Sequence, residues 1–136
     1  MPPYIAAQIA GGIIGVLATH AMFDVQIFEL SQHARSGAPL VFSELVATFG
    51  LVAVIWGVAR ARPDAVAYAV GGYIAAAYWF TPSTSFANPA VTIARTLTDT
   101  FAGVRPVDAP GFIAAQLAGA ACAAALMRWL RTEPSS

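Results

Sequence analysis

The residues that could act on a small molecule are concentrated in the tripeptide Asn88-Pro89-Ala90. Asn is a favoured helix N-cap and Pro is tolerated at the first helical position, so this tripeptide predicts a helix that begins at Pro89. The N-terminus of a helix carries about half a positive charge from its unpaired N–H groups. Together with the Asn88 amide, that dipole would suit neutral hydroxylated solutes and would repel cations and protons. The alternative is an ordinary surface helix with an Asn cap.

Glu44 is the second candidate, and Thr48 follows it by one helical turn in the same apolar segment. An ionisable group inside a membrane span costs at least about 2.5–3.5 kcal/mol, so it usually has a partner. We expect Glu44 to accept hydrogen bonds from the irregular backbone of residues 81–87 and so to hold the predicted helix in place. An interfacial Glu at a helix end and a proton relay are the alternatives.

The rest of the composition argues against covalent chemistry. The sequence contains no Ser/His/Asp set, metal-ligand cluster or glycine-rich phosphate loop. Its one cysteine, Cys122, excludes an internal disulfide and a Cys-based metal cluster. There is no Lys and the formal net charge is zero, so no basic patch is available for nucleic acid. The sequence predicts a protein that is not an enzyme and has no cofactor, no metal and no nucleic-acid partner.

The chain that must position these residues is unusually apolar. Of its 136 residues, 58% are hydrophobic and 10% are charged, and the mean hydropathy is +0.67. Soluble domains carry about 25% charged residues, so lipid is the predicted solvent and the fold class is an all-α membrane protein. Residues 89–101 are too short to cross a bilayer, which makes the helix at Pro89 a re-entrant half-helix. The predicted spans are residues 4–23, 40–59, 65–80 (short as counted) and 110–130.

The connections between the spans bear on exposure and orientation. Residues 24–39 are polar and are predicted to form an exposed loop. Four spans would put both termini on the side of the Arg60 and Arg62 turn. That side would collect four of the seven Arg residues. The positive-inside rule then predicts cytoplasmic termini in a multi-pass protein of the inner (plasma) membrane.

An internal repeat relates the two ends of the chain. Residues 2–11 and 110–119 are identical at seven of ten aligned positions, with Gln8 aligned to Gln116. Inverted repeats of three spans are common in membrane transport proteins. The repeat predicts that residues 1–23 are the last helix of a first repeat and that residues 40–131 are a complete second repeat. We therefore expect upstream residues that complete the first repeat.

Residues 85–92, Ser-Phe-Ala-Asn-Pro-Ala-Val-Thr, resemble the major intrinsic protein family, the aquaporins and aquaglyceroporins. Glu44 with Thr48, and the Ile-Ala-Ala-Gln of the first and last segments, are also similar to that family. The resemblance implies six spans and two half-helices that meet at mid-membrane. This chain would hold the third to sixth spans and the second half-helix. It would be a partial, N-terminally truncated aquaporin-like helical bundle of four spans plus one re-entrant half-helix, in a homotetramer.

The resemblance also implies which residues set selectivity. Family members usually carry Arg directly after this Asn-Pro-Ala motif, where this sequence has Val91. Two other filter positions fall at Ala76 and Ser85, and these small residues imply a wider, less polar constriction. That pattern is similar to the bacterial aquaglyceroporin-like branch linked to glycerol and arsenical passage. Arg95 could partly replace the missing Arg, although a snorkelling role at the outer interface is favoured.

Three functions remain open at this point. The leading one is channel-type passive transport of small neutral solutes, such as water, glycerol and arsenic hydroxides, across the lipid bilayer. The second is a non-conducting half-pore or interaction fragment that needs a second chain. The third is a proton-coupled carrier that uses Glu44.

Overall fold

The computed structural model describes residues 1–132, and within that range the chain is helical and contains no strand. The all-α class predicted from the sequence is confirmed. The elements in chain order are α1 (Pro2–Met22), α2 (Ala38–Ala61), the 3₁₀ turn η1 (Pro63–Ala65), α3 (Val66–Phe80), α4 (Pro89–Ala94), the 3₁₀ turn η2 (Arg95–Leu97) and α5 (Ala109–Thr132).

Three of these helices, α1, α2 and α5, are long and apolar enough to cross a membrane. The third predicted span, α3, has 15 residues. At about 1.5 Å per residue this is shorter than a hydrocarbon core of roughly 30 Å. The helix starts only after η1, which Pro63 opens, and it ends because the backbone of Thr81 is extended (φ −108°, ψ 133°). Of the four predicted spans, three therefore reach spanning length and α3 does not.

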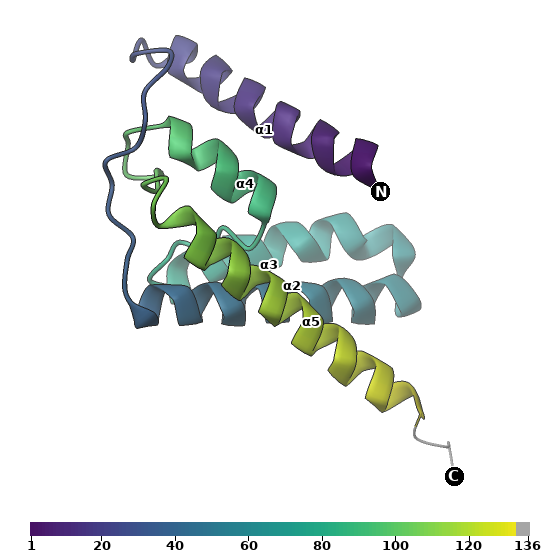
Figure 1. Ribbon diagram of the computed structural model, residues 1–136. Coiled ribbons are helices and arrows are strands. Elements are labelled where there is room, and N and C mark those ends of the chain that lie inside the picture. Colours follow the sequence, from purple (N-terminus) through teal and green to yellow (C-terminus); the bar gives the residue numbers. More distant parts are fainter. Residues whose placement is uncertain (133–136) are drawn as a thin grey trace.

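The helices form two groups, seen in Figure 1. In the first group α5 and α3 both pack on α2. The α2–α5 contact requires a glycine, because a Cβ atom on Gly119 would overlap the carbonyl oxygen of Leu45. Such close backbone approach is typical of helix packing in lipid. In the second group α1 packs against α4, which also contacts α5, so the half-helix lies between α1 and α5 (Figure 1).

In contrast to a water-soluble protein, this structure exposes many large apolar side chains on its surface. Large apolar side chains are uncovered on the helices, among them Trp79 at 85% and Ile14 at 66% exposed. Buried residues gather instead around the half-helix and its loops. There the rings of Phe86 and Phe112 meet edge to face at 5.5 Å, and Val104 packs with them. This distribution agrees with lipid as the solvent.

Candidate functional site

The half-helix begins at Pro89, as predicted, and Asn88 is its N-cap. The side-chain oxygen Oδ1 of Asn88 accepts hydrogen bonds from the backbone N–H of Ala90 at 2.8 Å and of Val91 at 3.4 Å. Because the helix holds Oδ1, the orientation of the whole amide is fixed. Within residues 1–132, the amide nitrogen Nδ2 makes no hydrogen bond, so its two hydrogens are free to donate to a ligand.

Glu44 of α2 lies under the segment that leads to Asn88 and is fully buried. Its Oε1 accepts from the Ser83 hydroxyl at 2.6 Å and from the Phe86 N–H at 2.9 Å. Its Oε2 accepts from the Ala87 N–H at 2.8 Å and from Gln116 Nε2 at 2.7 Å. The hydrogen bonds predicted between Glu44 and the backbone of 81–87 are therefore present. All four partners donate, so both oxygens of the Glu44 carboxyl group act as hydrogen-bond acceptors.

The segment that Glu44 holds has an unusual backbone. Thr84, Ser85 and Ala87 have φ values of 63°, 51° and 48°, in the left-handed region that non-glycine residues rarely adopt. Each such residue costs on the order of 1–3 kcal/mol and persists only where its surroundings fix it. The hydrogen bonds to Glu44 are the contacts that fix it here. This conformation turns two successive N–H groups, those of Phe86 and Ala87, toward the Glu44 carboxylate. The segment then leads directly into the helix cap at Asn88.

Gln116 of α5 connects Glu44 to the half-helix. Its Nε2 donates to Glu44 and also contacts the hydroxyl of Thr92 at 2.9 Å. The Thr92 hydroxyl donates in turn to the carbonyl oxygen of Asn88 at 3.0 Å. Gln116 and Thr92 are both buried. The sequence left open whether Gln116 bridges helices or faces a pore, and in the structure it bridges α2, α4 and α5.

Arg35 is a buried residue of this site that the sequence did not indicate. The prediction of an exposed loop at 24–39 is wrong at this point, because Arg35 is only 5% exposed. Its guanidinium donates to three backbone carbonyls, those of Ser83 (2.9 Å), Phe101 (2.6 Å) and Gly103 (2.7 Å). Burial lowers the pKa of Arg35 from its ordinary value. A single side chain thus joins three loops that are far apart in the sequence.

The backbone of Arg35 is held as well, by a carboxylate at the start of α5. Its N–H donates to Asp108 Oδ2 at 2.9 Å, and the same oxygen accepts from Arg105 Nε at 2.9 Å. The hydrogen bond from the Arg105 side chain is the main cause that lowers the pKa of Asp108. Asp108 is therefore ionised at neutral pH and fixes the end of the 23–37 connection against α5.

The three predicted filter residues do not line one pocket in this structure. Ala76 is exposed on α3 and Val91 is half-buried on α4. Ser85 is buried, and within residues 1–132 its hydroxyl has no hydrogen-bond partner. The hydroxyl of Thr48, one turn after Glu44, is also buried and has no hydrogen-bond partner among the described residues. The roles of these residues in selectivity stay predictions.

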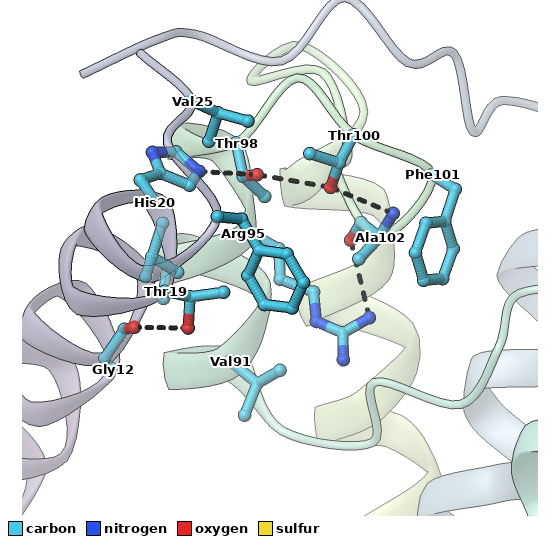
Figure 2. A pocket seen from close by; sticks show the side chains of 14 residues that line it. Gly12, Thr19, His20, Val25, Val91, Arg95, Thr98, Thr100, Phe101 and Ala102 are labelled. Carbon is cyan, nitrogen blue, oxygen red and sulfur yellow. Dashed lines mark hydrogen bonds between the residues drawn. The ribbon is translucent and has the colours of Figure 1, made fainter. Parts of the chain in front are cut away.

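A pocket of about 720 Å³ lies between α1 and the half-helix, and Val91 is part of its wall. Figure 2 shows a row of hydrogen bonds along one side. His20 Nε2 contacts the Thr98 hydroxyl at 2.8 Å, and Thr98 contacts the Thr100 hydroxyl at 3.2 Å. His20 Nδ1 lies 3.0 Å from the carbonyl oxygen of Ile27. His20 therefore joins the end of α1 to the loops on both sides of it.

Arg95 borders the same pocket, and its snorkelling role stays a prediction. Its guanidinium stacks over the ring of Phe86 at 4.5 Å. It also donates to the Ala102 carbonyl at 3.4 Å, as Figure 2 shows. Stacking of a guanidinium on an aromatic face is favourable by about 0.5–2 kcal/mol. The charge is thus held by groups of this chain beside the half-helix, one turn beyond Val91.

Comparison with known proteins gives a consistent result. The sequence model of the family described as Major intrinsic protein matches residues 58–135. The protein named Aquaglyceroporin AqpS, from Rhizobium meliloti (strain 1021), is 55% identical over 127 residues, which is 93% of this chain and 54% of that protein. The chain therefore spans about half the length of the relative that it matches. No solved structure matches the chain.

Proposed function

Because the chain belongs to the major intrinsic protein family and is a multi-pass membrane protein, we propose that it forms part of a channel for passive passage of small neutral solutes. The observation that carries this proposal is the Asn88 amide, whose Nδ2 donates to nothing within residues 1–132. The relative's printed name is aquaglyceroporin, which favours glycerol and similar polyols. Water and arsenic hydroxides are further candidates of the same neutral, hydroxylated chemistry.

Asn88 would act by replacing part of the hydration shell of the passing solute. Its oxygen is held by Ala90 and Val91, so the amide cannot rotate to present an acceptor. At this point, therefore, a hydroxyl group of the solute can only accept a hydrogen bond from the Asn88 amide. The positive end of the α4 dipole lies at the same place and disfavours cations and protons.

The width of the passage would be set by Ala76, Ser85 and Val91. None of them carries a charge or a bulky ring, so the constriction would accept a solute larger than water. Arg95 would supply a fixed positive charge near the outer end of α4, held by Phe86 and Ala102. A charge at that place would add to the exclusion of cations.

A complete passage would require a second half. We propose that residues 1–23 are the last helix of a first repeat and residues 40–131 a complete second repeat, with the rest supplied by sequence that the relative has and this chain does not match. We propose a homotetramer in the plasma membrane on the basis of family resemblance. The distribution of Arg residues supports cytoplasmic termini. The alternative is a non-conducting half-pore that serves as an interaction fragment, and the uncovered apolar surface of α1 favours a partner.

The experiment uses Asn88→Asp, because aspartate keeps the two cap hydrogen bonds to Ala90 and Val91 but lacks the Nδ2 donor. The chain is reconstituted in vesicles with the unmatched half of the 55% identical aquaglyceroporin, and glycerol flux is followed by stopped-flow light scattering. We expect a loss of about tenfold or more in glycerol flux, the effect of about 1.4 kcal/mol. Gln26→Glu, which makes the same change from amide to carboxylate at an exposed residue of the 23–37 connection, is the control. Unchanged flux in Asn88→Asp would remove Asn88 from the passage, and the absence of flux in all forms would favour the interaction fragment.

A further inference from the structure

The C-terminal ends of α2 and α5 form a second pocket, at the opposite end of α2 from Arg35. Its volume is about 370 Å³, and its wall consists of Ile55, Trp56, Ala59 and Arg60 of α2 with Arg131 of α5. Ligand pockets in proteins generally have volumes of roughly 300–1,000 Å³. We propose that this pocket binds the phosphate group of an anionic phospholipid. The proposal does not depend on whether a solute passes.

The two arginines bring more positive charge to this pocket than its surroundings offset. Arg60 and Arg131 lie in the last turns of their helices. Each helix C-terminus carries about half a negative charge, so the two ends offset about one of the two positive charges. The described wall contains no carboxylate, and the next one along the chain from Arg60, Asp64, is paired with Arg62 at 3.2 Å. The positive charge that remains matches the single negative charge of a phosphodiester.

The hydrogen-bond donors of this pocket are also unused within the chain. Four of the seven arginines have partners, namely Arg35, Arg62, Arg95 and Arg105. Within residues 1–132, the guanidiniums of Arg60 and Arg131 make no hydrogen bond or ion pair, and neither does the indole N–H of Trp56. A guanidinium binds phosphate well, because its planar fork donates two parallel N–H bonds. The pocket therefore offers donors from two helices to one anion.

The apolar part of the wall favours a lipid over a free phosphate ion. Trp56 precedes Arg60 by four residues, so it lies about 6 Å deeper along α2 on the same face of the helix. Trp56 is half-buried and Ile55 beside it is 37% exposed. A free ion would gain nothing from these groups, whereas the glycerol backbone and first methylenes of a phospholipid would cover them. Tryptophan is also enriched at this depth of a membrane.

The membrane surface on this side suits an anionic lipid. The distribution of Arg residues supports a cytoplasmic location for this end of the chain. Anionic phospholipids give the cytoplasmic leaflet a negative surface potential, and basic pockets between spanning helices on that side bind lipid head groups. The lipid class and the charge of the pocket therefore agree.

The test uses Trp56 as the reporter. Trp79→Phe and Trp129→Phe in the full chain leave Trp56 as the single tryptophan. This chain is reconstituted in phosphatidylcholine vesicles with a rising fraction of phosphatidylglycerol that carries bromine on its acyl chains, which quenches a tryptophan on contact. A parallel series with brominated phosphatidylcholine measures the neutral lipid. We expect a preference of about tenfold for the anionic lipid, since each basic residue near a membrane surface contributes several-fold.

Substitutions of the arginines test whether the pocket causes this preference. Arg60→Gln and Arg131→Gln should each reduce it by about threefold, and the double variant should show almost none. Arg128→Gln is the matched control, because Arg128 is exposed on the same helix as Arg131 but lies outside the pocket wall. It should change the preference by less than about 1.5-fold. An equal loss in Arg128→Gln would overturn the proposal, since the general charge of this end would then attract the lipid. Equal quenching by the two brominated lipids would overturn it as well.

Inorganic phosphate distinguishes the lipid from a free ion. It is added at millimolar concentration to the vesicles that contain brominated phosphatidylglycerol, with the ionic strength held constant so that screening does not change. A lipid site should keep its quenching, because the ion cannot replace the apolar contacts of the lipid. Recovery of Trp56 fluorescence would assign the pocket to the free ion and would refute a lipid site.

Discussion

Glu44 Oε2 and the backbone N–H of Ala87 are joined by a hydrogen bond of 2.8 Å, one residue before Asn88. The two residues are separated by 43 positions in the sequence. This bond fixes the place at which the half-helix starts, and so it fixes the direction in which the Asn88 amide points. The function proposed for Asn88 therefore depends on a carboxylate that no solute would touch.

Glu44→Gln should destabilise the fold and should not alter proton dependence of uptake. A glutamine amide brings two hydrogens toward positions where four groups already donate, so at least one buried donor loses its acceptor, at a cost of about 1–3 kcal/mol. The change in the free energy of unfolding is measured in mixed micelles, where circular dichroism follows the loss of helix. Glu29→Gln, in the 23–37 connection, is the control and should change it by less than about 0.5 kcal/mol. Uptake that responds to a pH gradient in wild type and loses that response in Glu44→Gln would instead support a proton-coupled carrier.

Arg35→Lys should loosen the three loops that Arg35 joins. Lysine keeps the charge but lacks the planar fork that reaches three carbonyls at once, so the carbonyls of Ser83, Phe101 and Gly103 cannot all be satisfied. We expect faster hydrogen exchange at the Phe86 amide, equivalent to about 1–3 kcal/mol. Arg62→Lys provides a control with the same chemical change, because Arg62 pairs with Asp64 on the exposed surface. Equal effects of the two substitutions would show that the carbonyl contacts of Arg35 contribute little.

Val91→Arg should reduce glycerol flux more than water flux. An arginine at the second position after Pro89 would narrow the passage and add donors, which exclude a polyol by size before they impede water. In the completed pore, glycerol flux should fall by about tenfold or more while water flux falls by less than about threefold. Stopped-flow measurements with the two osmolytes give both rates from one preparation. Equal loss of both fluxes would contradict the assignment of Val91 to the filter.

Gly119→Ala should weaken the packing of α5 on α2. A single methyl group at this position meets the carbonyl of Leu45, and overpacking of this kind costs about 1–3 kcal/mol. Gly57→Ala is the comparison, because nothing lies within 4 Å of that position. There the same change should be neutral or stabilising by up to about 1 kcal/mol, since alanine favours the helix. Thermal unfolding in detergent ranks the two variants, and a Gly119→Ala protein as stable as wild type would mean that the helices separate at no cost.

The parts of this site that the sequence predicted are those with a local or a chemical signal. The cap at Asn88 follows from residue type and position alone. The contact of Glu44 with residues 81–87 follows from the cost of a lone carboxylate in lipid, which requires donors, and from the irregular segment as their source. In both cases one residue type restricts the structure strongly.

Arg35 had no such signal. An arginine among polar residues in a loop is typical of a solvated surface, and its acceptors are main-chain carbonyls, which every residue possesses. The three carbonyls come from loops that are 48 to 68 residues away along the chain. Only their arrangement in space reveals the site. The length of α3, in contrast, was predicted, since the segment counted from the sequence, residues 65–80, was already short for a span and the helix is Val66–Phe80.

The four hydrogen bonds of Glu44 also have a consequence for biosynthesis. Glu44 enters the membrane with α2, but its donors at Ser83 and Gln116 follow 39 and 72 residues later. At about 5–20 residues per second, the carboxylate waits for several seconds before its shell is complete. Until the last donor, Gln116, has been added, its insertion cost of about 2.5–3.5 kcal/mol is offset only in part. We therefore expect α2, which carries Glu44, to depend more than the other helices on the insertion machinery. That dependence should last until α5, which carries Gln116, has been translated.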